Sequence, residues 1–403
     1  MRQELEKIHF LTGNAEYIEE ACHTPALPTW SEKAMEFLAA FSKNLMDDKS
    51  SRGYEDIMSY AFWIRKASLS GIKEHYYQDV DGKMGRGVAF HIAPSNVPIN
   101  FAVSFTSSLL AGNINIVRLS NKEFAQVDII IRALKKTFAD GMEDMEKYLI
   151  LIRYEHSDEV TAYLSSICDV RIIWGGNQTI ERIRKAMIPP RAIDMAFSDR
   201  HSIALMDAKA VLGGDIANLA EGFYTDTYYT DQNACSSPRM VVWFGEEKDV
   251  QKAQEVFWNK VYEIVKARYD MQPIQAIDKL EALCLLAASG AEAKVEGNNN
   301  RVRRVTVERL NDTIMDHKLG GGYFFEYASG SLDDLIPILG KSCQTVSYFG
   351  LDPKEIQRFV LDQGIRGVDR IVPIGKTMDL TFKWDGYDMI QNMSRWVYAP
   401  EYR

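Results

Sequence analysis

Short apolar runs alternate with longer segments of helical spacing through the first half of this chain, and no other feature limits its fold so strongly. The apolar runs occupy residues 88–92, 114–117, 148–152 and 170–174. Short buried strands that alternate with helices form parallel sheets with right-handed crossovers. We therefore predict an α/β protein whose first domain holds a parallel sheet of the Rossmann type.

The length of the chain predicts a second domain, because 403 residues exceed the size of one ordinary core. We expect residues 1–206 to form the N-terminal helices and the dinucleotide-binding domain. Residues 207–403 should form a second α/β domain, with a tail from about residue 376 that packs back on the first. Near the start, residues 29–32 (TWSE) have the spacing of a capping box, which predicts a helix start.

Charge and cysteine content exclude several classes of protein. The net charge is −9, and no block rich in Lys or Arg offers a surface for nucleic acid. Five scattered cysteines without a CxxC pair argue against a zinc site and fit a reducing compartment. The N-terminus lacks the apolar core of a signal peptide, and polar residues interrupt the uncharged stretch between Arg86 and Arg118. We expect a cytoplasmic protein without a membrane span.

Two candidate ligand-binding turns follow the first two apolar runs. Residues 94–98 (PSNVP) form a turn stiffened by prolines, in which the Asn96 amide could donate to a developing oxyanion. The alternative is an asparagine that bonds only its own turn. Arg118 and Lys122 flank Ser120 after the second run, at the strand end where parallel sheets bind ligands. These cations could hold a phosphate or simply face solvent.

A third turn, residues 174–178 (WGGNQ), lies between the fourth apolar run and a predicted helix. Gly175 and Gly176 would let the backbone approach a pyrophosphate, and a helix N-terminus favours anions. Gly-Gly turns are common, however, and no complete G-x-G-x-x-G follows any predicted strand. This turn alone is weak evidence for a dinucleotide.

Cys235 is the candidate nucleophile. It lies within residues 231–239 (DQNACSSPR), directly before a predicted strand, and the small side chains around it leave room for a substrate. A thiolate is both a strong nucleophile and a good leaving group, as transient acyl transfer requires. The alternative is a buried structural cysteine, which is the commoner role for this residue.

Five runs in a fixed order decide between these alternatives. They are residues 91–98 (HIAPSNVP), 111–120 (AGNINIVRLS), 233–238 (NACSSP), 370–375 (RIVPIG) and 384–388 (WDGYD). In this order they resemble the aldehyde dehydrogenase superfamily, and in detail its acyl-CoA reductase branch, typified by the fatty acid reductase of bacterial bioluminescence. The resemblance extends from about residue 55 to residue 396.

The resemblance implies an aldehyde-dehydrogenase-like fold, with a Rossmann-type cofactor domain and a second α/β domain that carries the catalytic cysteine. It implies that Cys235 is the catalytic thiol and that Asn96, with the Cys235 backbone N–H, forms the oxyanion hole. It places Arg118 and Ser120 at the adenosine ribose and Gly176 at the pyrophosphate. The residues expected at the cofactor are Pro94, Ser95, Arg118, Ser120, Gly175 and Gly176.

One departure from the superfamily bears on the reaction. Aldehyde-oxidising members carry a Glu, within a Glu-Leu-Gly-Gly run, that activates water. The corresponding region here, residues 196–201 (AFSDRH), has no such run. Without a dedicated base, hydrolysis of an acyl-enzyme should be slow, and a thiol acceptor can compete. His201 is either an acid/base group or a structural histidine.

A second departure bears on the cofactor. Members that prefer NAD often carry a Glu directly after the ribose-binding Ser. Here that position is Asn121, with Arg118 and Lys122 nearby. A missing carboxylate beside two cations favours NADPH, with NADH as the alternative.

The resemblance thus implies NADPH-dependent reduction of an acyl thioester to an aldehyde through an acyl-Cys235 intermediate, with no metal. The acyl donor could be acyl-CoA, an acyl carrier protein or an acylated synthetase. Aromatic residues such as Phe197, Phe223, Tyr228 and Tyr229 would suit a fatty acyl chain or an ordinary core. A homo-oligomer is an open expectation. The alternatives are an aldehyde dehydrogenase that forms an acid and a non-redox acyl-binding or acyltransferase protein.

Overall fold

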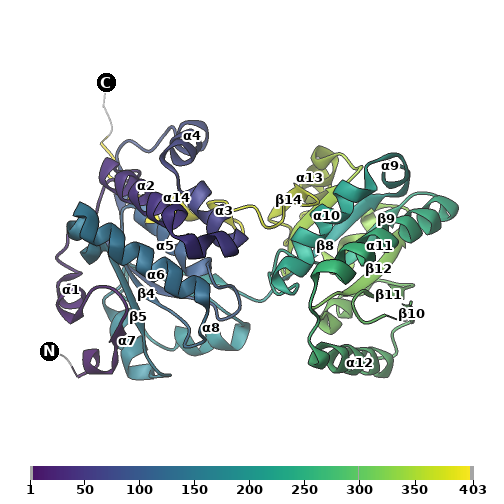
Figure 1. The fold of residues 1–403 in the computed structure, drawn as a ribbon, viewed down its shortest axis with the longest axis horizontal. Helices are drawn as coiled ribbons and strands as arrows, with labels where there is room; N and C mark the ends of the chain where they lie inside the picture. Colours follow the sequence, from purple (N-terminus) through teal and green to yellow (C-terminus); the bar gives the residue numbers. More distant parts are fainter. Residues whose placement is uncertain (1–2, 298, 400–403) are drawn as a thin grey trace. The chain divides into compact units, whose positions relative to one another are not determined.

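The computed structural model describes residues 3–297 and 299–399, and it divides into two compact units. The first comprises Met1–Ser198 and Leu380–Arg403, and the second comprises Asp199–Asp379. In Figure 1 the first unit runs from purple to teal and includes the yellow C-terminal segment. Both units are layered α/β structures, so the predicted fold class is confirmed.

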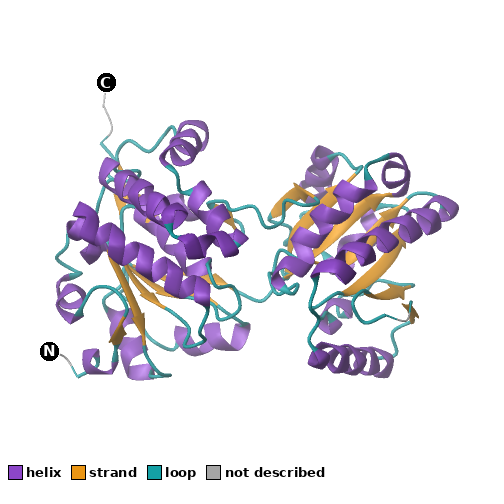
Figure 2. Cartoon of the chain, in the orientation of Figure 1, coloured by secondary structure: helices purple, strands orange, loops and turns teal. Residues whose placement is uncertain are grey.

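A six-stranded sheet with the order β1-β5-β4-β3-β6-β7 forms the centre of the first unit. All neighbouring strands are parallel except β1, which pairs antiparallel with β5. Helices pack around this sheet (Figure 2). The strands are β1 (His9–Phe10), β3 (Val88–Ile92), β4 (Ile114–Arg118), β5 (Leu149–Arg153), β6 (Val170–Trp174) and β7 (Ile193–Phe197). The helices are α1 (Ala15–Glu20), α2 (Glu32–Asp47), α3 (Glu55–Trp63), α4 (Lys66–Tyr76), α5 (Asn100–Ala111), α6 (Ala125–Thr137), α7 (Asp158–Ser166), α8 (Asn177–Arg184) and α14 (Met389–Met393).

The four apolar runs form β3 to β6, which confirms these predicted strands. The capping-box prediction was wrong by two residues. Ser31 is the N-cap of α2, where its side chain accepts from the Ala34 N–H (3.3 Å). Thr29 instead donates its hydroxyl to the Ala111 carbonyl (3.1 Å), which ties the segment before α2 to the end of α5.

A seven-stranded sheet with the order β10-β11-β12-β9-β8-β13-β14 forms the centre of the second unit. Among these described strands only β10 is antiparallel to its neighbour, and it forms a hairpin with β11. The strands are β8 (His201–Asp207), β9 (Pro238–Phe244), β10 (Ala293–Glu296), β11 (Arg303–Val307), β12 (Tyr323–Ser329), β13 (Cys343–Phe349) and β14 (Arg370–Pro373). The helices are α9 (Ala208–Gly213), α10 (Ile216–Thr227), α11 (Glu247–Arg268), α12 (Pro273–Ala288) and α13 (Pro353–Asp362).

The boundary between the units lies after Ser198, whereas the sequence placed it after residue 206. The difference concerns β8. Its two neighbours, β9 and β13, both belong to the second sheet, so β8 is a central strand there. The C-terminal segment of the first unit begins at Leu380, where the sequence predicted a return from about residue 376. Within that segment β17 (Ser394–Trp396) pairs with β2 (Lys83–Gly85), and β15 (Lys383–Trp384) pairs with β16 (Tyr387–Asp388).

Asn113 ties this returning segment to the start of β3. Its buried side chain accepts from the Arg86 N–H (2.7 Å) and the Gly87 N–H (3.2 Å), and it donates to the Met393 carbonyl (3.0 Å). Asn113→Ala leaves these groups without partners, so the free energy of unfolding should fall by about 2–4 kcal/mol. Chemical denaturation measures this change. The exposed Asn121→Ala is the control, and an Asn113→Ala protein as stable as that control would contradict the assignment.

Candidate active site

The predicted cofactor residues lie in the first unit, along the edge where its parallel strands end. β4, β3 and β6 are neighbours, so the loops after them meet at this edge. The Ala93 N–H donates to the Arg118 carbonyl (3.0 Å), and the Gly175 N–H donates to the Phe197 carbonyl (3.1 Å), which joins each loop to the next strand. The residues on this edge are Pro94, Ser95 and Asn96 after β3, Arg118 and Ser120 at the end of β4, and Gly175 and Gly176 after β6.

The chain reverses its direction across the sheet between β3 and β6. From β3 it continues to β4 and β5 on one side, and it then crosses to β6 and β7 on the other. In open parallel sheets such a reversal leaves a crevice at the carboxyl ends of the strands, where ligands bind. The turn that contains Asn96 and the Gly175-Gly176 turn flank this reversal.

Arg118 offers an unused donor at this edge. Its guanidinium lies 4.9 Å from the centre of the Tyr154 ring, and the side chain is half-buried. Among residues 3–297 and 299–399 its buried Nε atom has no hydrogen-bond partner. Ser120 accepts from the Lys122 N–H (3.1 Å), and Asn121 donates to Glu155 (3.2 Å). A cation with a spare N–H beside hydroxyl and amide groups fits a phosphorylated ribose.

The start of α8 offers backbone donors. Gly176 is its N-cap, and no described side chain caps this end of the helix. Gly176 is exposed, and a Cβ added to it would meet no described atom within 4 Å. The first N–H groups of a helix are unpaired and carry its positive dipole end. This end of α8 therefore fits a pyrophosphate, and with Arg118 the edge fits a dinucleotide.

Cys235 lies in the second unit, in the turn directly before β9, and is half-buried. Ser202, on β8, donates its hydroxyl to the Cys235 carbonyl (2.7 Å) and accepts from the Thr345 N–H on β13 (3.1 Å). The Ser237 N–H donates to the Ala234 carbonyl (3.0 Å), which closes the turn. The backbone of the predicted nucleophile is therefore anchored to the central strands of its sheet.

Gln232 holds the other side of this loop. Asp231 and Gln232 both have left-handed backbone, with φ of 52° and 60°, which is costly for residues with side chains. The buried Gln232 amide compensates with four hydrogen bonds. It donates to the carbonyls of Pro238 (2.8 Å) and Tyr323 (3.2 Å), and it accepts from the N–H groups of Gly322 (2.9 Å) and Tyr323 (3.3 Å). Every donor and acceptor of the amide is used.

Arg239 is a charged neighbour of Cys235 that sequence reasoning missed, although it ends the same motif. Burial lowers the pKa of its guanidinium to about 10, and the opposite charges of Cys235 and Asp199 counteract this effect. Because the interaction is mutual, the Arg239 cation favours the thiolate form of Cys235. The missed signal was the position of Arg239 two residues into β9 and four residues after the sulfur.

His201 has the surroundings of a structural histidine. It is buried at the start of β8, and its Nε2 atom lies 3.1 Å from the Ile338 carbonyl, so the ring donates there. Burial lowers the pKa of His201 to about 4. A neutral, carbonyl-bound imidazole of this pKa is a poor proton acceptor at neutral pH. Of the four aromatic residues weighed for an acyl chain, Phe197, Phe223 and Tyr228 are core residues and Tyr229 is exposed.

The run 370–375 forms the edge strand β14 and a turn that packs against α10. Gly375 has φ of 89° and lies so close to Gly222 that a Cβ on either residue would meet the other's backbone at 3.0 Å. Asp226, also on α10, accepts from the N–H groups of Gly375 (2.7 Å) and Thr377 (3.0 Å). Next along the chain, Met378 accepts from the Ser236 hydroxyl (3.6 Å). This turn therefore supports the loop that carries Cys235.

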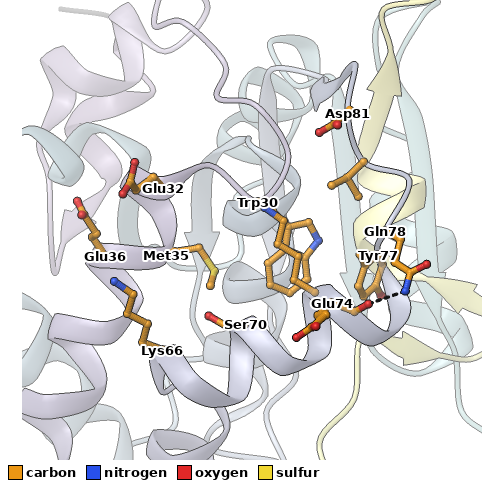
Figure 3. Close-up of a pocket in the computed structure, with 12 residues that line it drawn as sticks. Trp30, Glu32, Met35, Glu36, Lys66, Ser70, Glu74, Tyr77, Gln78 and Asp81 are labelled. Carbon is orange, nitrogen blue, oxygen red and sulfur yellow. Dashed lines mark hydrogen bonds between the residues drawn. The ribbon is translucent and has the colours of Figure 1, made fainter.

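A separate cavity of 480 Å³ lies in the first unit between α2 and α4 (Figure 3). Trp30, Met35 and Tyr77 line it together with charged residues such as Lys66 and Glu74. None of the predicted site residues lines this cavity. In the described part of the chain no cluster of three or more His, Cys, Asp or Glu could hold a metal ion. In the same part, every helix is too short or too polar to cross a membrane.

The two sheets and their connections define the aldehyde dehydrogenase fold. Lactaldehyde dehydrogenase from Escherichia coli matches 95% of this chain and 91% of its own, with a TM-score of 0.63 at 13% identity. A 1-pyrroline-5-carboxylate dehydrogenase from Thermus, solved with bound NAD, matches 94% of this chain and 82% of its own, with a TM-score of 0.61 at 13% identity. At these identities the likeness concerns the fold alone.

Within this fold the chain belongs to the acyl-CoA reductase (LuxC) family, whose profile matches residues 14–396. The long-chain acyl-protein thioester reductase of Vibrio harveyi is 25% identical over 323 residues, which cover 77% of this chain. This chain spans 63% of the length of that relative. The protein of the same name from Photorhabdus laumondii is 22% identical over 382 residues, covering 88% of this chain and 75% of its own.

Asp226 should make stability depend on pH. Burial raises the pKa of its carboxyl to about 6 from an ordinary value of 3.8, even though two N–H groups stabilise the charge. The folded state therefore holds this proton more tightly than the unfolded state. Compared with Asp226→Asn, the wild type should lose roughly 2–3 kcal/mol of stability as pH rises from about 4 to about 6.

Urea denaturation at several pH values measures this difference. Asp215→Asn, which changes an exposed carboxylate that caps the same helix, controls for a general effect of charge. If the wild type and Asp226→Asn show parallel pH profiles, the buried carboxylate has no such role.

Proposed function

We propose that this protein reduces an acyl thioester to an aldehyde with NADPH, through a covalent thioester on Cys235. The observation that carries the proposal is the setting of Cys235, a half-buried sulfur in an anchored loop with the Arg239 cation as its neighbour. Membership of the acyl-CoA reductase family and the dinucleotide-like edge of the first sheet support it.

The first step is attack of the Cys235 thiolate on the acyl carbonyl. A carbon–sulfur bond forms to Cys235 and the carbon–sulfur bond to the carrier breaks, so the carrier leaves as a thiol after taking up a proton. The Cys235 backbone N–H stabilises the oxyanion between these events, and the family resemblance implies the Asn96 amide as a second donor. The Arg239 cation near the sulfur would stabilise the thiolate that attacks.

The second step converts the acyl-enzyme into product. NADPH, held by Arg118, Ser120 and the start of α8, would supply the hydride that turns the acyl-Cys235 thioester into a thiohemiacetal. The thiohemiacetal then collapses: its carbon–sulfur bond to Cys235 breaks, and the aldehyde and the Cys235 thiolate are formed. In total one thioester, one NADPH and one proton give one aldehyde, one thiol and one NADP⁺.

The residues after β4 favour NADPH over NADH. Arg118 keeps a buried Nε without a described partner, and Lys122 lies four residues further on in the same exposed turn. Asn121, which stands between them, is itself uncharged, and the two cations must outweigh the Glu155 carboxylate to which Asn121 donates (3.2 Å). Arg118, Ser120 and the start of α8 would hold the adenosine ribose and the phosphates.

The acyl donor we propose is a long-chain acyl-protein, since the relatives from Vibrio harveyi and Photorhabdus laumondii are named for that substrate. Acyl-CoA is the alternative donor and offers the same thioester bond. The rival reaction, oxidation of an aldehyde to an acid, needs a base that activates water, and His201 does not fit this role. A non-redox acyl-binding protein would have no use for the dinucleotide edge.

Cys235→Ala should abolish reduction while NADPH still binds, because cofactor and nucleophile sites lie on different sheets. The assay follows consumption of NADPH, and of NADH in parallel, with acyl-CoA and acyl-protein donors, and traps the aldehyde with a hydrazine. Cys284→Ala, which removes an exposed cysteine on α12, should keep full activity. Turnover by Cys235→Ala would end the covalent mechanism, and a wild type that binds neither cofactor would end the reductase proposal.

Asn96→Ala should lower kcat by about a hundredfold or more, because one oxyanion donor is lost in the transition state. KM for the acyl donor should change little, since the donor acts on charge that develops during the reaction. Steady-state kinetics separates the two parameters. Asn218→Ala, an exposed amide on α10, is the control. An unchanged kcat would remove Asn96 from the reaction.

A further inference from the structure

Two aromatic rings stack where β6 and β7 end, beside the Gly175-Gly176 turn. Trp174 and Phe197 are partners in the register of these parallel strands. Their ring centres are 3.8 Å apart, and the planes differ by 9°. Both side chains are largely buried, and Tyr387 packs edge-on against Phe197 at 5.5 Å. All three residues belong to the first unit.

A buried chain of hydrogen bonds fixes the Trp174 ring. Its indole N–H donates to the Ser104 hydroxyl on α5 (3.1 Å), and Ser104 lies 2.8 Å from Nδ1 of His91 on β3. His91 Nε2 lies 3.0 Å from the Asn115 amide oxygen on β4. The Asn115 amide nitrogen donates in turn to the carbonyls of Asn113 (3.0 Å) and Tyr148 (3.1 Å).

The direction of this chain is determined by its two ends. Trp174 can only donate, so Ser104 accepts from it and donates to His91 Nδ1. His91 then donates from Nε2 to Asn115, which passes both of its amide hydrogens to backbone carbonyls. Burial lowers the pKa of His91 to about 4, so the ring is neutral at physiological pH, as this order requires. Every member has its partners, and the ring of Trp174 is held in one orientation.

The position of the stack along the sheet edge assigns it to one end of a dinucleotide. Arg118 and Ser120 follow β4, and the start of α8 follows β6, so the ribose and pyrophosphate sites proposed above run from β4 towards β6. β7 is the next strand in the same direction. A dinucleotide that continues along the edge places its nicotinamide half at the ends of β6 and β7, about 10–14 Å from β4 at the usual strand spacing.

We propose that Trp174, stacked on Phe197, positions the nicotinamide half of the cofactor, and that Ser104 and His91 are positioning residues that act through Trp174. This inference rests on the proposed function, because it requires that a nicotinamide dinucleotide binds this edge. A fixed apolar ring at this point gives the planar nicotinamide a surface to pack against and limits the positions from which its hydride can leave. The chain from Trp174 to Asn115 supplies the rigidity.

Two ligands separate the halves of the site. NADPH contains the nicotinamide, whereas adenosine 2′,5′-bisphosphate contains only the adenosine end. Titration calorimetry with the full chain should show that Trp174→Ala weakens NADPH binding about tenfold, the scale of one lost aromatic contact. Binding of adenosine 2′,5′-bisphosphate should stay within about twofold of wild type, since Trp174 makes no contact with that half.

Gentler variants keep the test valid if Trp174→Ala fails to fold. Trp174→Phe keeps an aromatic ring but loses the indole N–H, and Ser104→Ala removes the hydroxyl that accepts from this N–H. Both variants should weaken NADPH binding by about threefold, because the ring is then less firmly oriented. The matched control is Thr106→Val on the same helix, which removes the buried hydroxyl partner of Tyr60 (2.7 Å). It should bind both ligands as the wild type does.

Two other outcomes would overturn the inference. If Trp174→Ala weakens the binding of both ligands equally, or leaves NADPH binding unchanged, the stack serves only core packing. Those outcomes would leave the proposed function intact. A wild type that binds neither ligand would overturn the proposed function itself, and this inference with it.

Discussion

The first unit depends on the parallel pairing of β3 with β4 and β6. All five residues of β3 are buried, so a slip of one residue against either neighbour would move every side chain to the wrong face. Polar residues reinforce this register from within, because His91 reaches Asn115 only when β3 and β4 are aligned as they are. Once the register is set, the turns after these strands meet at one edge, and the candidate cofactor site follows from the pairing.

The loop that carries Cys235, residues 231–237, is held by side chains rather than by strand pairing. It lies directly before β9, outside the backbone hydrogen bonds of the sheet. Gln232 clamps the loop to β12, and Ser202 clamps it to β8. Two left-handed residues make the loop costly to form, and the four hydrogen bonds of Gln232 offset that cost. A loop held in this way keeps a sulfur in place without a helix or strand around it.

Much of this arrangement could be predicted from local pattern, and the rest depends on distant partners. β3 to β6 were predictable because each is a continuous apolar run. β7 was not, because Asp194 interrupts its apolar pattern; in the structure this carboxylate pairs with the buried Arg171 on the neighbouring strand β6. The membership of β8 was missed for a related reason: a strand pattern does not say which sheet it joins.

The candidate site shows the same division. The order of motifs predicted Cys235 and the turns after the strands of the first sheet, because those residues lie next to one another along the chain. It could not predict that the His201 ring hydrogen-bonds to the Ile338 carbonyl, because that carbonyl lies 137 residues further along the chain. The contribution of Arg239 was hidden for the opposite reason. Its place in the motif was visible, but its proximity to the sulfur depends on where β9 begins.

The departure from the superfamily in region 196–201 has a physical consequence in the structure. In oxidising members of the superfamily this region supplies the carboxylate that activates water. Here it supplies Phe197, whose ring is committed to Trp174 on one face and to Tyr387 at its edge. Such a ring can support Trp174 but cannot accept a proton. If Trp174 positions the cofactor as proposed, the side chain that supports it stands in the region where oxidising members carry the base, and the acyl-enzyme then accepts hydride rather than activated water.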